Sequence, residues 1–257
     1  MARLHFLGTS AALPTRERAN TMLAVLPDGG APGLLIDCGD RVYASLLRAG
    51  LGPDAIGDLF ITHAHIDHIG ALPSLIESLR LSGRRRPLRI LAIPEALSVA
   101  HALLAAFDFE LTLDTWAFDV TLAPVEPGEE FALAGFAARV ARMDHSVPSA
   151  GLRLELPRGP ITYTCDTQPT PAIRALGAGS RLLIAECTFL HAQEAAARAS
   201  KHMTAREAGE QAALCGAEEL ALVHIGGVWP TEQGIAEAAR SFAGAITIPN
   251  DGDEITV

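Results

Sequence analysis

The sequence contains few of the features that hold small or membrane-bound proteins in place. Four cysteines occur, at Cys38, Cys165, Cys187 and Cys215. They show no Cys-x-x-Cys spacing, and a chain of 257 residues can form a core without disulfides, so we expect free thiols. No apolar run approaches the length of a transmembrane helix, and His5 and Gly8 interrupt the first apolar stretch too early for a signal peptide. These absences predict a cytoplasmic protein without membrane contact.

Positive charge is scarce as well. Lys and Arg number 20 against 30 Asp and Glu, which gives a formal net charge of −10. An extended nucleic-acid surface normally needs clustered Lys and Arg, because these side chains displace the counterions of the phosphates. One basic run is present at Arg84, Arg85 and Arg86, and we interpret it as an exposed loop that follows a helix. The charge therefore disfavours binding to a long RNA.

The apolar pattern alternates short strand-like runs with helical stretches. Predicted strands cover residues 4–7, 21–26, 33–36, 58–61, 88–92, 151–156, 161–164, 182–185 and 220–223. Predicted helices cover residues 41–49, 68–81, 94–106, 170–178, 191–199, 204–215 and 231–242. The region after the third helix, up to residue 141, alternates polar and apolar residues and favours several antiparallel strands.

Both halves of the chain repeat the order of strands followed by helices. This order predicts an α/β fold in which two mixed β-sheets pack face to face and helices cover both outer faces, a four-layer αββα sandwich. The hydrophobic content of 49% is sufficient for a substantial core. We therefore expect a single domain over residues 1–257.

The strongest chemical signal directly follows the predicted strand at 58–61. Residues 62–70 read Thr-His-Ala-His-Ile-Asp-His-Ile-Gly and place His63, His65, Asp67 and His68 in one short segment. Imidazole nitrogens and carboxylate oxygens are the usual ligands of a borderline metal such as zinc. A loop at a strand end can direct some of these side chains at one ion and their neighbours at a second. The segment therefore predicts a metal site rather than a polar turn with unrelated histidines.

One motif cannot fill two metal sites, so further ligands must come from elsewhere in the fold. His145, Asp166 and His224 each stand next to a predicted strand end. Taken alone, each could be an ordinary polar residue, but together with the first motif they complete a set of five His and two Asp. This set allows three His and a shared Asp on one metal, and two His, one Asp and the shared Asp on the other. We expect two divalent ions, with zinc preferred and manganese or iron compatible with the same ligands.

The pattern formed by these seven residues resembles the metallo-β-lactamase superfamily. Within that superfamily the chain is most similar to ribonuclease Z and its phosphodiesterase relatives. Four stretches carry this narrower resemblance: residues 6–14 (Phe-Leu-Gly-Thr-Ser-Ala-Ala-Leu-Pro), 36–39 (Ile-Asp-Cys-Gly), 145–149 (His-Ser-Val-Pro-Ser) and 202–205 (His-Met-Thr-Ala). The resemblance runs over nearly the full length, and it implies the metallo-β-lactamase fold and a hydrolase.

The resemblance also implies a role for each matching residue. One metal would be held by His63, His65 and His145, the other by Asp67, His68 and His224, and Asp166 would bridge the two. A hydroxide between the metals would cut a phosphodiester bond, and Asp67 would help to orient it. The proton donor to the leaving group would be His202, held by Glu186. The alternative for His202 is a solvent-facing residue before a helix that Thr204 caps.

The spacing of the ligands bears on the substrate. Ribonuclease Z carries a long arm for transfer RNA between the third metal ligand and the bridging Asp, but here His145 and Asp166 are only 21 positions apart (166 − 145). Two predicted strands and their turn use nearly all of these positions. We therefore expect a small phosphodiester or a short oligonucleotide as substrate, and the family resemblance implies a homodimer.

Three alternative functions stay open at this point. The same metal site could hydrolyse a lactam, a lactone or a thioester. The chain could be a true transfer-RNA 3′-processing endoribonuclease that works without the arm. It could also be a non-catalytic relative that uses the fold as a binding module, although such proteins usually lose metal ligands and this sequence retains all seven.

Overall fold

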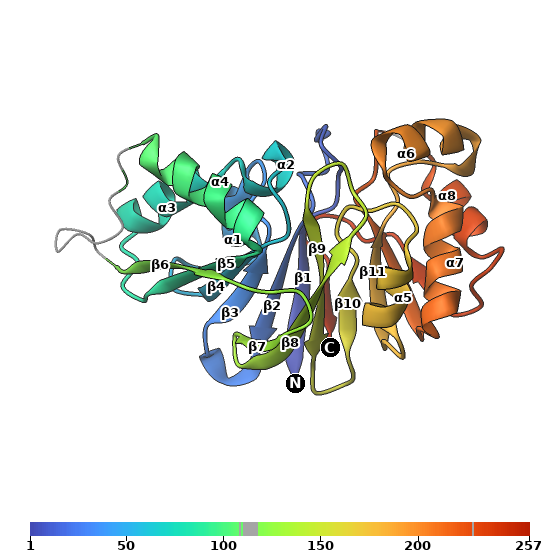
Figure 1. The fold of residues 1–257 in the computed structure, drawn as a ribbon. Helices are drawn as coiled ribbons and strands as arrows, with labels where there is room; N and C mark the ends of the chain where they lie inside the picture. Colours follow the sequence, from blue (N-terminus) through green and yellow to red (C-terminus); the bar gives the residue numbers. More distant parts are fainter. Residues whose placement is uncertain (108, 110–117, 228) are drawn as a thin grey trace.

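The protein folds into two mixed β-sheets that face each other (Figure 1). The computed structural model describes residues 1–257 except 108, 110–117 and 228, and within the described residues each sheet has seven strands. The first sheet has the order β14 (Glu254–Thr256), β1 (Ala2–Gly8), β2 (Met22–Pro27), β3 (Gly33–Ile36), β4 (Ile56–Ile61), β5 (Leu88–Ala92) and β6 (Val120–Pro124). The second has the order β13 (Ala245–Thr247), β12 (Glu219–Val223), β11 (Leu182–Glu186), β10 (Ile161–Tyr163), β9 (Ser149–Glu155), β8 (Phe136–Met143) and β7 (Glu130–Leu133).

Helices cover the outer faces of the sheets, as the sequence predicted. In the first half these are α1 (Val42–Arg48), α2 (Ile66–Ile69), α3 (Leu72–Leu81) and α4 (Pro94–Ala105). In the second half they are α5 (Pro171–Gly177), α6 (Glu194–Ser200), α7 (Ala205–Cys215) and α8 (Thr231–Ala238), with short 3-10 turns at Asp28–Gly30 and His191–Gln193. The helices α1 and α4 contact the first sheet, whereas α5, α7 and α8 contact the second (Figure 1). Among the described residues, no helix combines the length and apolarity needed to cross a membrane.

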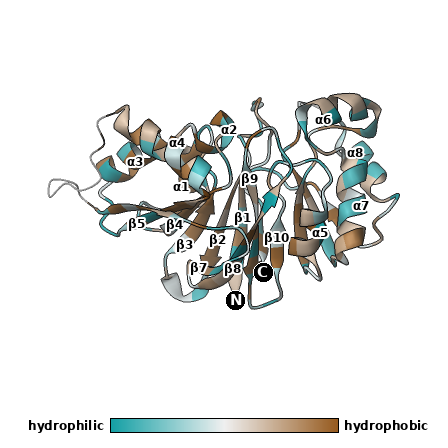
Figure 2. Ribbon diagram, in the orientation of Figure 1, coloured by the Kyte–Doolittle hydropathy of each residue, from teal (hydrophilic) through white to brown (hydrophobic). Residues whose placement is uncertain are grey.

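The core lies between the two sheets and beneath the helices. Every residue of β3, β10 and β11 is buried, because these strands are covered on both faces. Hydrophobic residues are concentrated in the central strands, whereas the helices carry both hydrophobic and hydrophilic residues (Figure 2). All four cysteines are buried free thiols.

The strand directions determine where loops with chemistry can meet. In the first sheet β3 to β6 run parallel to one another, and in the second sheet β10 to β13 do the same. The carboxyl ends of parallel strands lie at the same edge of a sheet, which is where open α/β sheets usually place their ligands. The loops that follow β4, β10, β11 and β12 meet at one end of the sandwich, because side chains from these loops and from the end of β11 come within 4.8 Å of one another there.

Three local features differ from the sequence predictions. The helix expected at 68–81 is broken into α2 and α3, because Ala71 donates its N–H to the carbonyl of Cys38 instead of continuing the helix. Strand β6 pairs parallel with β5, although antiparallel strands were expected up to residue 141, while β7 and β8 are antiparallel as expected. Residues 110–117 of that region lie outside the described residues. The strands β13 and β14 were not predicted.

The interpretation of Arg84 as an exposed loop residue is wrong. Its side chain is fully buried, and its guanidinium donates to the carbonyls of Pro53, Ile56, Arg86 and Pro87 at 2.6–2.8 Å. The guanidinium also lies 5.1 Å from the ring centroid of Phe118. A planar group with five N–H donors can satisfy several carbonyls at once, so Arg84 joins the segment before β4 to the segment before β5.

Replacement of Arg84 by methionine is therefore expected to reduce the free energy of unfolding by about 3 kcal/mol, because buried carbonyl groups would lose their donors. Chemical denaturation of the variant measures this loss. Arg85→Met is the matched control, since the Arg85 side chain is exposed. The free energy of unfolding of this variant should equal that of the wild type. Equal stability of the two variants would show that the Arg84 hydrogen bonds do not stabilise the fold.

Candidate metal centre

The seven predicted ligand residues all come together at the end of the sandwich described above. His63 and His65 follow β4, Asp67 and His68 lie in α2, His145 follows β8, Asp166 follows β10 and His224 follows β12. The residues Cys165 and His224 have φ angles of 48° and 57°, a left-handed backbone that is uncommon outside glycine. Such backbone strain gathers at functional sites, where the surrounding fold holds it in place.

The first group of ligand atoms consists of three imidazole nitrogens and one carboxylate oxygen. The Nδ1 atom of His65 lies 3.1 Å from Nε2 of both His63 and His145. The Oδ2 atom of Asp166 lies 3.7 Å from Nε2 of His63 and 4.0 Å from Nε2 of His145. Ligands about 2.1 Å from a tetrahedral metal ion are about 3.4 Å apart, so the dimensions of this group suit a tetrahedral divalent ion.

The second group shares the same oxygen of Asp166. That oxygen lies 3.4 Å from Nε2 of His68 and 3.2 Å from Nε2 of His224. The Oδ2 atom of Asp67 lies 3.4 and 3.5 Å from the same two nitrogens. Burial alone would raise the pKa of Asp166, but His224, His68 and His63 hold that pKa well below its usual value. Asp166 is therefore an anion at the centre of both groups.

Buried polar atoms without hydrogen-bond partners also indicate a metal site here. Nε2 of His68, Nε2 of His224 and Oδ1 of Asp166 are buried and have no hydrogen-bond partner. Leaving three such atoms unsatisfied is costly in a folded protein. Their arrangement, with unpartnered nitrogens directed at a carboxylate, fits metal ligation, so the residues present are suited to divalent ions.

Outer partners fix the orientation of four of the imidazoles. The Nδ1 atom of His68 contacts Asp37 at 2.8 Å, that of His145 contacts the carbonyl of Lys201 at 3.0 Å, and that of His224 contacts the hydroxyl of Thr188 at 2.8 Å. The fourth, Nδ1 of His63, contacts the Thr62 hydroxyl at 3.0 Å. Such partners select the tautomer that leaves the other nitrogen available for a metal.

Two of these outer partners, Asp37 and Thr188, received no role from the sequence. Asp37 is fully buried and also accepts hydrogen bonds from the N–H and hydroxyl of Thr62, at 2.8 and 3.0 Å. Its position after the predicted strand at 33–36 was a usable signal, because polar residues at strand ends of parallel sheets gather at one edge. Thr188 gave no comparable signal in the sequence.

His202 and Glu186 form the hydrogen-bonded pair that the family resemblance implied. Nδ1 of His202 lies 2.7 Å from Oε1 of Glu186, whose side chain is fully buried. Burial disfavours the charged imidazole, but Glu186 outweighs this and raises the pKa of His202 to about 9. The other oxygen of Glu186 accepts from the hydroxyl of Thr188, which links the pair to His224. Thr204 does cap α7, and the capped turn holds His202 against the site rather than in solvent.

Members of both ligand groups and His202 line one hollow. The hollow has a volume of about 380 Å³, and its lining includes His65, Asp67, His145, His202 and His224. Two facing mixed sheets with such clusters at their strand ends define a metal-dependent hydrolase of the metallo-β-lactamase fold.

Comparison with known proteins agrees with this class. The model of the family described as beta-lactamase superfamily domain matches residues 33–225. A ribonuclease Z of Halorubrum lacusprofundi is 31% identical over 99% of this chain and 97% of its own length, and one of Bradyrhizobium sp. is 30% identical over all of both chains. This chain belongs to the β-lactamase superfamily and, within it, to the branch that resembles ribonuclease Z.

Solved structures show the same fold. The metallo-beta-lactamase fold protein YhfI from Bacillus subtilis matches with a TM-score of 0.84 at 23% identity. The match covers 99% of this chain and 98% of the YhfI chain. The short form of human tRNase Z has a TM-score of 0.79 at 24% identity, covering 99% of each chain.

Proposed function

We propose that this protein is a phosphodiesterase that holds two divalent metal ions, preferably zinc, and cleaves a small phosphodiester. The arrangement that supports this proposal is Asp166, whose one oxygen belongs to two ligand groups, next to the His202 and Glu186 pair. Two such ions would supply a hydroxide near neutral pH and would neutralise charge on the phosphoryl oxygens. Manganese or iron would suit the same ligands.

The chain's own residues would then hold and move protons. Asp67 lies at the edge of the hollow, where its carboxylate can accept a hydrogen bond from the attacking water and orient it. Because Nδ1 of His202 is bonded to Glu186, its Nε2 is the nitrogen left to protonate the departing oxygen. Glu186 stabilises the imidazolium form that this step needs. A thioester hydrolase would have less need of such a donor, because its leaving thiolate is stable near neutral pH.

The choice of a small substrate rests on the segment between His145 and Asp166. In the structure β9 and β10 form an antiparallel hairpin there, joined by residues 156–160. The alignment with the Halorubrum relative spans 308 positions, 51 more than the 257 residues of this chain. We propose that the missing positions include the arm for transfer RNA, in agreement with the net charge of −10.

Buried residues of both sheets form one hydrophobic cluster, which supports a single domain over residues 1–257. A cytoplasmic location and a homodimer stay predictions.

The deciding experiment compares hydrolysis of bis(p-nitrophenyl) phosphate with cleavage of a precursor transfer RNA by metal-reconstituted protein. We expect cleavage of the small diester alone, and no activity from the Asp67→Ala control. Removal of the RNA trailer would show that this is a transfer-RNA processing enzyme, as the names of its relatives suggest. Faster hydrolysis of a chromogenic lactam or ester would point to carbonyl chemistry.

Glu186→Gln is expected to move the alkaline fall of kcat to lower pH by about one to three units. A general acid works only in its protonated form, so activity falls as the pH rises through the pKa of His202. The carboxylate of Glu186 holds that pKa high, and an amide would leave burial free to lower it. The pH dependence of kcat for a diester with an alkoxide leaving group, such as a dinucleoside monophosphate, measures the shift. An unchanged alkaline limb would separate Glu186 from the proton donor.

A further inference from the structure

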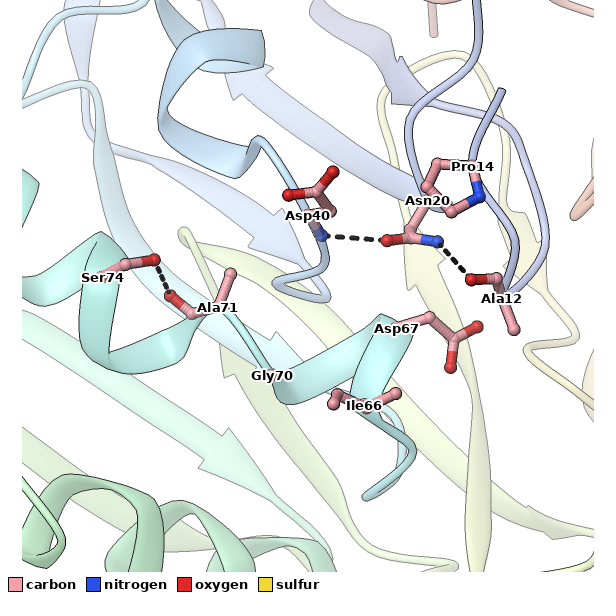
Figure 3. A pocket seen from close by; sticks show the side chains of 9 residues that line it. All are labelled: Ala12, Pro14, Asn20, Asp40, Ile66, Asp67, Gly70, Ala71 and Ser74. Carbon is pink, nitrogen blue, oxygen red and sulfur yellow. Dashed lines mark hydrogen bonds between the residues drawn. The ribbon is translucent and has the colours of Figure 1, made fainter. Parts of the chain in front are cut away.

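A groove extends from the metal centre along α2 and α3. The hollow over the metal ligands shares Ala12, Ile66 and Asp67 with a second hollow of about 410 Å³. The second shares Gly70 and Ser74 with a third hollow of about 320 Å³. We call the second and third hollows together the α3 groove. It leaves the metal centre on the side of Asp67, and His202 is not among its lining residues (Figure 3).

Apolar side chains make up most of the α3 groove. Its lining includes Pro14, Ile66, Pro73, Phe107 and Phe109. The side chains of Ile66 and Phe107 are 81% and 64% exposed, although such residues are usually buried. Their exposure next to a catalytic centre suits the apolar face of a substrate group.

The charged groups that line the groove are carboxylates. They belong to Asp40, Asp67 and Glu77, and no Lys or Arg lines it among the described residues. Arg41, which lies 3.3 Å from Asp40, is exposed and outside the lining. Arg80 binds Glu77 at 2.6 Å and is likewise outside the lining. An anionic group placed here would therefore meet three carboxylates, while Arg41 and Arg80 are each already paired with one of them, which is unfavourable.

The donors that face the groove are already used within the chain (Figure 3). The amide nitrogen of Asn20 donates to the carbonyl of Ala11 at 2.8 Å, and the Asn20 oxygen accepts from the N–H of Asp40. The hydroxyl of Ser74 donates to the carbonyl of Ala71 at 2.9 Å. Glu77 is bound by Arg80, and Asp67 belongs to a candidate metal group. The Asp40 carboxylate and the lone pairs of Ser74 therefore remain for a ligand. The groove therefore complements hydroxyl or amino donors on an otherwise apolar group.

We propose that the α3 groove binds the ester group that stays on the phosphate, and that this group is a nucleoside without a further phosphate. The sugar hydroxyls of a nucleoside can donate to the Asp40 carboxylate, as ribose hydroxyls donate to acidic residues in dinucleotide-binding folds. The flat base can pack against Pro73 and Phe107. The leaving group would lie toward His202. The substrate class is then a mononucleotide diester, which rests on the phosphodiesterase function proposed above.

A matched pair of chromogenic diesters tests this inference. Thymidine 5′-(p-nitrophenyl phosphate) is compared with the same ester bearing an added 3′-phosphate, and methyl p-nitrophenyl phosphate serves as the ester without a nucleoside. For the wild type we expect kcat/KM to be about tenfold or more higher for the thymidine ester than for the methyl ester. The added 3′-phosphate should lower kcat/KM again by about tenfold or more relative to the thymidine ester.

Two variants of α3 then change the charge at one position each. Ser74→Arg places a cation in the groove and should remove most of the penalty for the 3′-phosphate. Leu81→Arg adds the same charge on the same helix at a site that is 71% exposed and outside the groove lining, so its preference should equal that of the wild type.

Each outcome has one meaning. Equal rates for the three esters, or a preference for the 3′-phosphate in the wild type, would overturn the inference while the phosphodiesterase function stands. An unchanged penalty in Ser74→Arg would overturn the placement of the nucleoside in the groove. Failure to hydrolyse any diester would overturn the proposed function itself, and this inference with it.

Discussion

Replacement of His202 by alanine is expected to lower kcat by about 10²- to 10⁴-fold for a diester with an alkoxide leaving group, such as a dinucleoside monophosphate. The departing alkoxide needs a proton, and Nε2 of His202 is the donor that the bond to Glu186 leaves available. A p-nitrophenolate ion is stable at neutral pH and needs no proton. The same variant should therefore lose less than about tenfold on bis(p-nitrophenyl) phosphate.

Two controls separate this role from others. His101→Ala removes an exposed imidazole from α4 and should leave both rates unchanged. Metal content is measured on every variant, because ligand atoms of Glu186, His202 and His224 also lie close enough together to hold an ion. An equal loss on both diesters would argue against a proton donor, and loss of metal from the His202 variant would make His202 a ligand.

The sequence predicted the grouping of those site residues that lie close together in one motif. His63, His65, Asp67 and His68 fall within one segment after a strand, and periodicity alone identified that strand. The distant candidate ligands His145, Asp166 and His224 were selected because each also stands next to a predicted strand end. Strands that run in the same direction bring such ends to one edge, so position along the chain favoured a meeting of these residues, and the family resemblance supplied the assignment of each.

The sequence could not predict contacts that depend on the packing of distant segments. Arg84 looks like part of a solvated basic run, but carbonyls from residues 53 and 56, some 30 positions earlier, enclose its guanidinium. The bonds from Asp37 to His68 and from Thr188 to His224 likewise join residues 31 and 36 positions apart. Polar partners of this kind are chosen by tertiary geometry, and hydrophobic periodicity carries no information about them.

Asp166→Ala is expected to remove both metal ions, because one oxygen of Asp166 lies within 4.0 Å of Nε2 of His63, His68, His145 and His224. A ligand that serves a single group, such as His65, should remove only one ion when it is changed to alanine. Loss of the ions withdraws several kcal/mol of transition-state stabilisation, so kcat/KM should fall by about 10³-fold or more in Asp166→Ala.

Metal stoichiometry per chain, measured by elemental analysis after dialysis, distinguishes these cases. We expect two ions in the wild type and in the control Asp119→Ala, which changes an exposed carboxylate. His65→Ala should retain one ion and Asp166→Ala fewer than one. If Asp166→Ala keeps one ion at full occupancy, the two groups do not share their carboxylate and the site is not bridged. A single ion in the wild type would restrict the mechanism to one group, and comparison of His65→Ala with Asp67→Ala would then identify which group it is.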